Sequence, residues 1–152
     1  MRLSLIKCGT YPNEMADNGY HYMRYSLMPH AGSWQAAGVA NEAYAFNCPL
    51  LATVTEGTGT LASAYSFVSA DCPNVIITVA KEACDNEDII IRAYEANGMR
   101  TKAALTFGFD AAEVTEVNMM ETEVVEKFAV DQNKIETMFQ PYEIKTFRVV
   151  RK

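Results

Sequence analysis

The sequence predicts a mainly β protein, built from antiparallel β-sandwich units with one short helix. Many short segments alternate apolar and polar residues, which is the pattern of strands that bury one face. Clusters of Asn, Asp, Gly and Pro separate these segments at short intervals, as in sandwiches and barrels. Only the stretch that begins near Trp34 has the features of a substantial helix.

The first part of the chain is expected to contain three strands and the helix. Residues 2–8 alternate before a glycine, and residues 20–28 carry bulky side chains on both faces. A strand that is covered on both faces belongs in the middle of a layered β structure. Ser33 is the expected N-cap of a helix over about 34–46, and residues 50–55 form a further strand.

Further alternating segments follow, and they are separated by turn-forming residues. Asn97-Gly98, between two of these segments, is the strongest hairpin signal in the chain. The expected strands cover residues 64–69, 75–81, 89–96, 102–109, 114–119 and 144–150.

Two glycines within residues 56–60 indicate a domain boundary. We therefore expect residues 1–57 to form the tail of a larger β-sandwich domain that includes the helix, and residues 58–152 to form a small C-terminal β-sandwich. A sheet without its neighbouring strands exposes edges and apolar surface. The isolated chain is therefore expected to dimerise or to exchange strands as a homo-oligomer.

Composition excludes two classes of partner. The net charge is −6 and the 13 basic residues are scattered, so nucleic acid is not expected as a partner. No apolar run approaches the roughly 20 residues that span a bilayer, so no membrane association is expected. Four cysteines without a Cys-x-x-Cys motif, together with no apolar leader, predict a reducing, cytoplasmic environment.

A specific pattern occupies residues 19–34. Alternate positions carry Gly19, His21, Met23, Tyr25 and Leu27, and the segment Pro29-His30-Ala31-Gly32-Ser33-Trp34 closes it. This pattern resembles the C-terminal β region of glycoside hydrolase family 38, the class II α-mannosidases.

The resemblance covers nearly the whole chain. The family usually has phenylalanine where this chain has Met23, and an acidic residue is common where it has Tyr20. Similar segments elsewhere are Arg2-Leu3-Ser4-Leu5-Ile6-Lys7, Thr10-Tyr11-Pro12, Asn47-Cys48-Pro49-Leu50, Pro73-Asn74-Val75, Arg92-Ala93-Tyr94-Glu95 and Pro141-Tyr142-Glu143-Ile144-Lys145-Thr146-Phe147.

The resemblance implies that the chain is the C-terminal β-domain fragment of an α-mannosidase, a retaining, zinc-dependent glycosyl hydrolase of terminal α-D-mannosides. In that family the nucleophile and the zinc ligands lie in an N-terminal α/β domain, which is absent here. The implied partners are this upstream catalytic domain of the same polypeptide and an α-mannoside glycan. The fragment would serve as scaffold or as a wall of the cleft, and would be inactive alone. The alternative is a non-catalytic carbohydrate-binding or protein-docking β-module.

No catalytic residue and no metal site is expected within the chain. Retaining hydrolysis needs two carboxyl groups about 5 Å apart, and no such pair is indicated. The acidic residues gather at loops and strand edges, where they usually serve as solvated charge. Two histidines and four separated cysteines do not match the spacing of common zinc sites, so zinc is expected only in the catalytic domain.

Four residues are candidates for facing a substrate: His30, His21, Arg24 and Arg92. His30 follows a proline at a strand end, where a turn can present it to a domain interface. His21 lies on a covered strand, where a histidine is more often a hydrogen-bonded core residue. Both arginines offer donors to sugar hydroxyls, although for Arg92 a strand arginine paired with Glu95 or Glu82 is the commoner arrangement. Trp34 could stack on a sugar but more often such a residue packs a helix onto a sheet.

Overall fold

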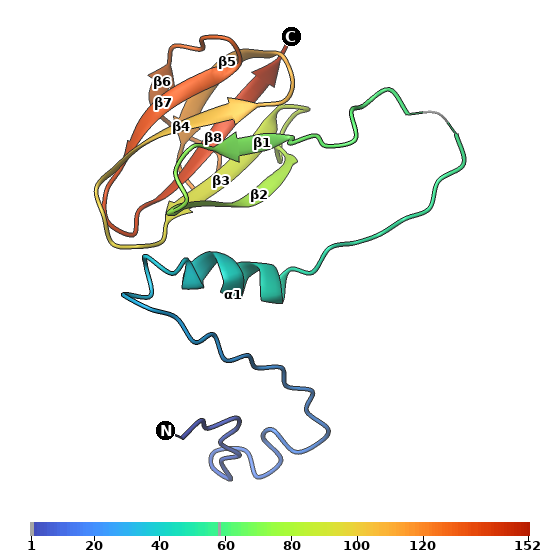
Figure 1. Ribbon diagram of the computed structural model, residues 1–152, viewed down its shortest axis with the longest axis vertical. Coiled ribbons are helices and arrows are strands. Elements are labelled where there is room, and N and C mark those ends of the chain that lie inside the picture. Colours follow the sequence, from blue (N-terminus) through green and yellow to red (C-terminus); the bar gives the residue numbers. More distant parts are fainter. Residues whose placement is uncertain (1, 58) are drawn as a thin grey trace. The chain divides into compact units, whose positions relative to one another are not determined.

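The computed structural model describes residues 2–57 and 59–152 (Figure 1). The chain divides into two units, Met1–His30 and Ala31–Lys152. In the described residues, every helix and strand lies in the second unit. No helix there is long and apolar enough to cross a membrane.

Two antiparallel sheets form the second unit. One contains three strands in the order β1-β4-β7, and the other contains five in the order β2-β3-β8-β5-β6. This confirms the predicted fold class of a β-sandwich with one short helix. The strands are β1 (Val68–Ala70), β2 (Val75–Glu82), β3 (Ile89–Glu95), β4 (Thr101–Phe107), β5 (Ala111–Val117), β6 (Val124–Phe128), β7 (Lys134–Phe139) and β8 (Ile144–Arg151).

The hydrophobic core lies between the two sheets. Alternate residues of β3 and β4 supply it, among them Ile91 and Leu105, which are both fully buried. The rings of Phe139 in β7 and Phe147 in β8 meet edge to face across the two layers, with centroids 6.4 Å apart. Because each strand turns every second side chain inward, the alternation in the sequence predicts this core correctly.

The outer face of the five-stranded sheet is also partly covered. Ile90 in β3 is fully buried although it lies outside the core cluster. Its partners in register are Lys81 of β2 and Arg148 of β8, so these three side chains share the outer face. The turn between β5 and β6 contacts that face, because Arg148 Nη2 donates to the Glu121 carbonyl oxygen at 3.0 Å. Central strand β3 is therefore covered on both faces at Ile90.

Helix α1 (Val39–Asn47) begins later than the sequence predicts. Ser33 is not its N-cap as predicted: Ser33 Oγ accepts the Ala36 amide at 3.2 Å, but the N-cap of α1 is Gly38, which has no side-chain cap. The segment that follows is a run of turns rather than an α-helix, and Gly38 then adopts a left-handed φ of 68° before the helix starts. Tyr44 in α1 donates its hydroxyl to the Thr78 carbonyl at 3.4 Å, which ties the helix to β2.

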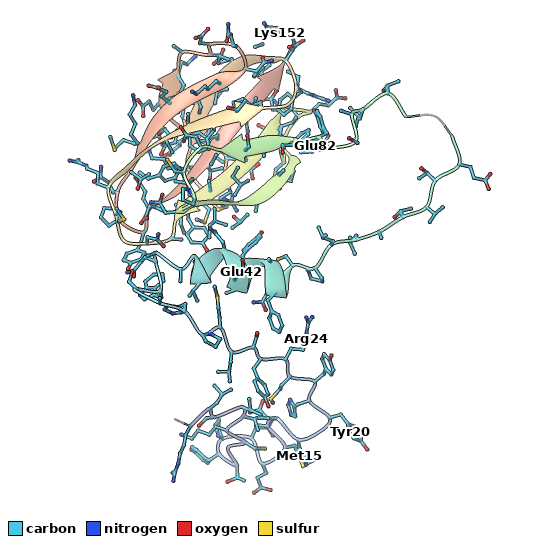
Figure 2. The ribbon with its side chains drawn as sticks, viewed as in Figure 1. Met15, Tyr20, Arg24, Glu42, Glu82 and Lys152 are labelled. Atoms are coloured by element: carbon cyan, nitrogen blue, oxygen red, sulfur yellow. The ribbon has the colours of Figure 1, made fainter. Side chains whose placement is uncertain are left out.

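Residues 2–8, 20–28 and 50–55 do not form strands in this structure, contrary to their alternation. The expected central strand is instead exposed, and Figure 2 shows the Tyr20 side chain directed away from the ribbon. A strand is stable only when a neighbour satisfies its backbone groups, and no described segment pairs with these three. The division at residue 57 into two sandwich domains stays a prediction.

Asn97-Gly98 is not a hairpin turn, so this prediction is wrong. The segment connects β3 with β4, and these strands belong to different sheets. Gly98 does adopt a positive φ, 74°, which explains why a glycine stands there. The chain crosses between the layers at this point because a buried carboxylate, described below, holds the loop amides.

Candidate functional site

Three of the four predicted residues lie in the unit that ends at His30. His21, Arg24 and His30 are all exposed. The His21 ring donates from Nε2 to the Asp17 carbonyl oxygen at 2.7 Å, so one ring nitrogen is used within its own loop. His21 is therefore neither a core residue nor part of a strand.

Arg92, the fourth predicted residue, is a partly buried strand arginine with several partners. Its Nε donates to Thr146 Oγ1 at 3.0 Å, and its Nη2 donates to the Met119 carbonyl at 3.2 Å. The nearest carboxylate is that of Glu121, 4.0 Å from Nη2. Arg92 therefore lies near a glutamate, as expected for a strand arginine. The glutamate is Glu121, however, and not Glu82 or Glu95.

Glu121 is the centre of this charged group on the outer face. It lies in the β5–β6 turn at φ 65°, a conformation that non-glycine residues rarely adopt. Its carboxylate accepts the Lys81 ammonium at 2.8 Å and the Cys84 amide at 3.1 Å. The Lys81 hydrogen bond holds the pKa of Glu121 below its ordinary value despite burial. The same bond raises the pKa of Lys81.

The Glu121 cluster also includes Arg148. Its guanidinium forms a bidentate pair with Asp85, with Nη2 at 2.9 Å from Oδ1 and Nη1 at 3.3 Å from Oδ2. Its Nε is buried without a hydrogen-bond partner in the described residues. Ion pairs thus tie the turn after β5 to strands β2 and β3, and the hydrogen bond from Arg148 to the Glu121 carbonyl oxygen ties it to β8. This arrangement locks a turn to a sheet, and it uses Nε and Nη2 of Arg92.

A second polar centre, Glu95, lies at the end of β3 and is fully buried. Its Oε1 accepts from Asn74 Nδ2 at 2.9 Å and from the Asn97 amide at 2.8 Å. Its Oε2 accepts the amides of Gly98, Met99 and Tyr142 at 2.7, 3.0 and 3.1 Å. Burial alone would raise the pKa of Glu95, but these bonds together lower it.

The Glu95 and Glu121 centres could not be located from strand alternation. A weak signal for Glu95 existed, because an acidic residue two positions before an Asn-Gly pair can accept loop amides. Glu121 had no local signal, since its partners come from β2, β3 and the turn after β2, which are distant in sequence.

The described residues contain no group of three or more His, Cys, Asp and Glu side chains that could hold a metal ion. The residues present therefore do not fit a zinc site. The observed carboxylates are instead used structurally: Glu95 holds a loop, Glu121 holds a turn, and Glu116 pairs with Lys145 at 2.6 Å in a buried position. These contacts stabilise the fold.

Comparisons of the sequence with a family model and with curated proteins agree with each other. Residues 74–147 match the family model described as the glycosyl hydrolases family 38 C-terminal beta sandwich domain. The chain is 30% identical to mouse alpha-mannosidase 2C1 over 99% of its length, and 31% identical to alpha-mannosidase G of Dictyostelium discoideum over 97%. It is 25% identical to a Saccharomyces cerevisiae alpha-mannosidase over 98%. The chain spans only 15%, 14% and 16% of these relatives, respectively.

Proposed function

This chain belongs to glycosyl hydrolase family 38 through its C-terminal β-sandwich domain, and from this we propose that it is the C-terminal part of an α-mannosidase. The observation that carries the proposal is the extent of the similarity. It covers 97–99% of this chain, including the segments outside the sandwich, but only 14–16% of each relative. A chain of this kind supplies one part of a longer enzyme.

We propose that an upstream domain of the same polypeptide carries out the catalytic reaction. That domain would hydrolyse terminal α-D-mannosides of a glycan with retention, using a carboxylate pair, and would hold the zinc ion. The described residues here contain no group of three or more side chains that could hold that ion. The role of this chain would be to support the catalytic domain and to form a wall of its cleft, where His21, Arg24, His30 and Arg92 stay candidates for contact with substrate.

Exposed apolar side chains support the proposal of an upstream partner. In residues 2–67 large apolar side chains lie in solvent at alternate positions of segments that form no strand. Such a surface is costly unless another part of the protein covers it. The most exposed are Tyr20, Tyr22, Tyr11, Leu50, Leu51 and Val54. We propose that upstream strands pair with these segments, and that without them the chain self-associates.

The cytoplasm is the proposed location. All four cysteines are free thiols, and three of them are exposed. Exposed free thiols persist in a reducing compartment, whereas an oxidising one would favour disulfides. Fractionation of source cells, followed by immunoblotting with an antibody against this chain, tests the assignment.

The same antibody tests the main proposal by the mass of the native polypeptide. A band far above 16.9 kDa is expected, because the chain would be one part of a longer enzyme. The longer polypeptide should then hydrolyse an aryl α-mannoside and lose activity when zinc is removed by a chelator. A band at 16.9 kDa would reject the proposal and leave the alternative, a free-standing module for binding carbohydrate or protein.

A further inference from the structure

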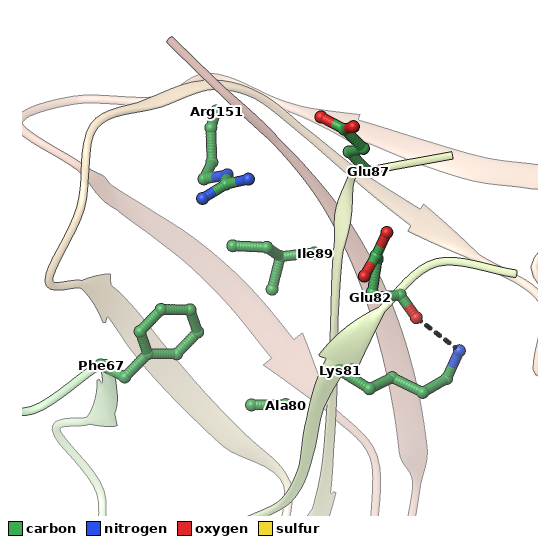
Figure 3. Close-up of a pocket in the computed structure, with 7 residues that line it drawn as sticks. All are labelled: Phe67, Ala80, Lys81, Glu82, Glu87, Ile89 and Arg151. Atoms are coloured by element: carbon green, nitrogen blue, oxygen red, sulfur yellow. Dashed lines mark hydrogen bonds between the residues drawn. The ribbon is translucent and has the colours of Figure 1, made fainter. Parts of the chain in front are cut away.

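A pocket of about 450 Å³ opens at one end of the sandwich, between the two sheets (Figure 3). Its apolar lining comes from Ala80 of β2, Ile89 of β3 and Phe67, which directly precedes β1 of the other sheet. The volume lies within the range of about 300–1,000 Å³ that is typical of small-molecule sites. Neither the family match nor the predicted site residues include it as a site.

The Phe67 ring is held in place but remains accessible. It packs on Phe109 with ring centroids 4.8 Å apart, and 42% of the residue is exposed. Ile89 beneath the opening is buried. The ring therefore provides a fixed apolar surface on which a flat apolar face can stack without first being ordered.

Three charged side chains surround this apolar surface. Glu82 of β2 is paired in register with Ile89, and Glu87 lies just before β3. On the other side, Ile89 is paired with Val149 of β8, and Arg151 follows two residues later on that strand. In Figure 3 the Arg151 guanidinium lies on one side of Ile89, and both carboxylates lie on the other. Within the described chain the side chains of these three residues form no hydrogen bond or ion pair.

The fourth charged residue of the lining is not available to a ligand. The Lys81 ammonium donates to the Glu82 carbonyl oxygen at 3.0 Å and pairs with Glu121 at 2.8 Å on the outer face of the sheet. The groups offered to a ligand are thus two carboxylates, which only accept hydrogen bonds, and one guanidinium, which only donates.

A ligand that satisfies these groups must donate and accept hydrogen bonds around an apolar face. Hydroxyl groups do both, whereas an anion would be repelled by Glu82 and Glu87, and an ammonium or guanidinium ion only donates hydrogen bonds and would leave the donors of Arg151 unsatisfied. We propose that this pocket binds a neutral saccharide ring, whose C–H face stacks on Phe67 and whose hydroxyls bond to Glu82, Glu87 and Arg151. The inference does not depend on the proposed α-mannosidase function, because it requires no hydrolysis.

Ligand-observed NMR on the 152-residue chain tests the proposal. Saturation-transfer difference spectra would be recorded with methyl α-D-mannopyranoside and methyl β-D-galactopyranoside, and this readout tolerates self-association. We expect saturation of ring protons by the wild-type chain. Arg151→Gln and Glu87→Gln should each raise the Kd about fivefold, as the loss of one hydrogen bond of about 1 kcal/mol predicts.

Matched substitutions outside the pocket provide the controls. Arg100→Gln and Glu42→Gln remove the same charges at exposed positions that do not line it, and they should leave the Kd unchanged. Phe67→Leu keeps an apolar side chain but removes the aromatic ring. It should therefore weaken the saturation-transfer signal of the sugar C–H protons that stack on this ring.

Three results would overturn the proposal. One is the absence of saturable binding by either glycoside, and a second is binding that Arg151→Gln and Glu87→Gln leave unchanged. The third is selective binding of a lysine-containing peptide in place of the glycosides, which would make the pocket a groove for basic peptides. Circular dichroism of each variant shows that the fold is retained, so that lost binding can be attributed to the pocket.

Discussion

Glu95 is a buried carboxylate that carries its charge without an ion pair in the described chain. Its charge is balanced by five neutral donors, of which four are backbone amides of two connecting loops. Such bonds to a charged acceptor are worth more than neutral ones. One side chain thereby fixes the crossing from β3 to β4 and the start of the β7–β8 turn.

Replacement of Glu95 by glutamine should lower the free energy of unfolding by about 3 kcal/mol. The glutamine NH2 group would face at least two of the donors that now point at a carboxylate oxygen. Urea denaturation at neutral pH measures the change. Glu126→Gln, at an exposed strand position, is the control and should be neutral within about 0.5 kcal/mol.

Glu95 should also make stability depend on acid pH. Its folded-state pKa is lower than the unfolded value, so its contribution is complete above the unfolded pKa and is lost as pH falls through the folded pKa. Unfolding free energies of the wild type should therefore fall below about pH 4.5, and those of Glu95→Gln should fall less steeply. Parallel pH curves for the two proteins would contradict this role.

The Glu116–Lys145 pair is the second residue-scale case, because both side chains are largely buried and 2.6 Å apart. Lys145→Met leaves the carboxylate buried without this partner and should cost about 3 kcal/mol or more. The double variant Glu116→Leu with Lys145→Met removes both charges and should recover most of that loss. A double variant less stable than Lys145→Met would show that the pair itself is strongly stabilising.

At the scale of elements, alternation predicted strands where the chain supplies partners. Segments 75–81, 89–96, 102–109 and 144–150 coincide closely with β2, β3, β4 and β8, whereas segment 114–119 overlaps only the second half of β5, and segment 64–69 overlaps β1 only at its last two residues. The strand β7 was missed although Ile135, Thr137 and Phe139 alternate inward, because the turn residues before it masked the pattern. The exposed strand β6 has no burial pattern, and only its register with β5 defines it.

The first strand depends on one glycine. Tyr65 donates its hydroxyl to the Gly108 carbonyl, and the Gly108 amide donates to the Phe67 carbonyl at 2.9 Å. A Cβ at Gly108 would collide with the Ser66 carbonyl oxygen and would lie 2.8 Å from the Tyr65 hydroxyl. The approach of these two backbone segments therefore requires glycine.

Gly108→Ala should cost about 1–3 kcal/mol and loosen β1 from β4. Hydrogen exchange should accelerate at Val68–Ala70, while the amides of β3 and β8 keep their protection. Gly59→Ala is the control, since nothing lies within 4 Å of a Cβ there. Uniform acceleration across both sheets would mean that β1 does not open separately.

At the scale of the whole molecule, the site could be predicted less well than the fold. Arg92 was recognised as a strand arginine with a glutamate partner, but the partner is contributed by a distant turn. His21 and Arg24 lie on a segment that alternates in sequence but forms no strand, because it finds no partner strand among the described residues, and His30 follows that segment. Alternation specifies which face of a strand is apolar, but it does not specify what covers that face.

The exposed segments lead to a last prediction about assembly. Full-length chain should self-associate in a concentration-dependent way, because Tyr22, Leu27 and their neighbours present apolar surface and unpaired backbone. Light scattering after size-exclusion chromatography should give a mass above 16.9 kDa that rises with concentration. The unit Ala31–Lys152, which retains the whole sandwich, should associate less.

Substitutions in the intact chain test whether the exposed apolar side chains cause the self-association, without shortening the chain. Tyr22→Ser combined with Leu27→Ser should reduce the mass toward the monomer value, because it removes apolar surface from one alternating segment. Met120→Ser, at a residue of the sandwich that is 77% exposed, removes an exposed apolar side chain outside these segments and should leave the mass unchanged. A monomer at every concentration would show that these segments need no covering partner. The proposal that upstream strands pair with them would then lose its physical basis.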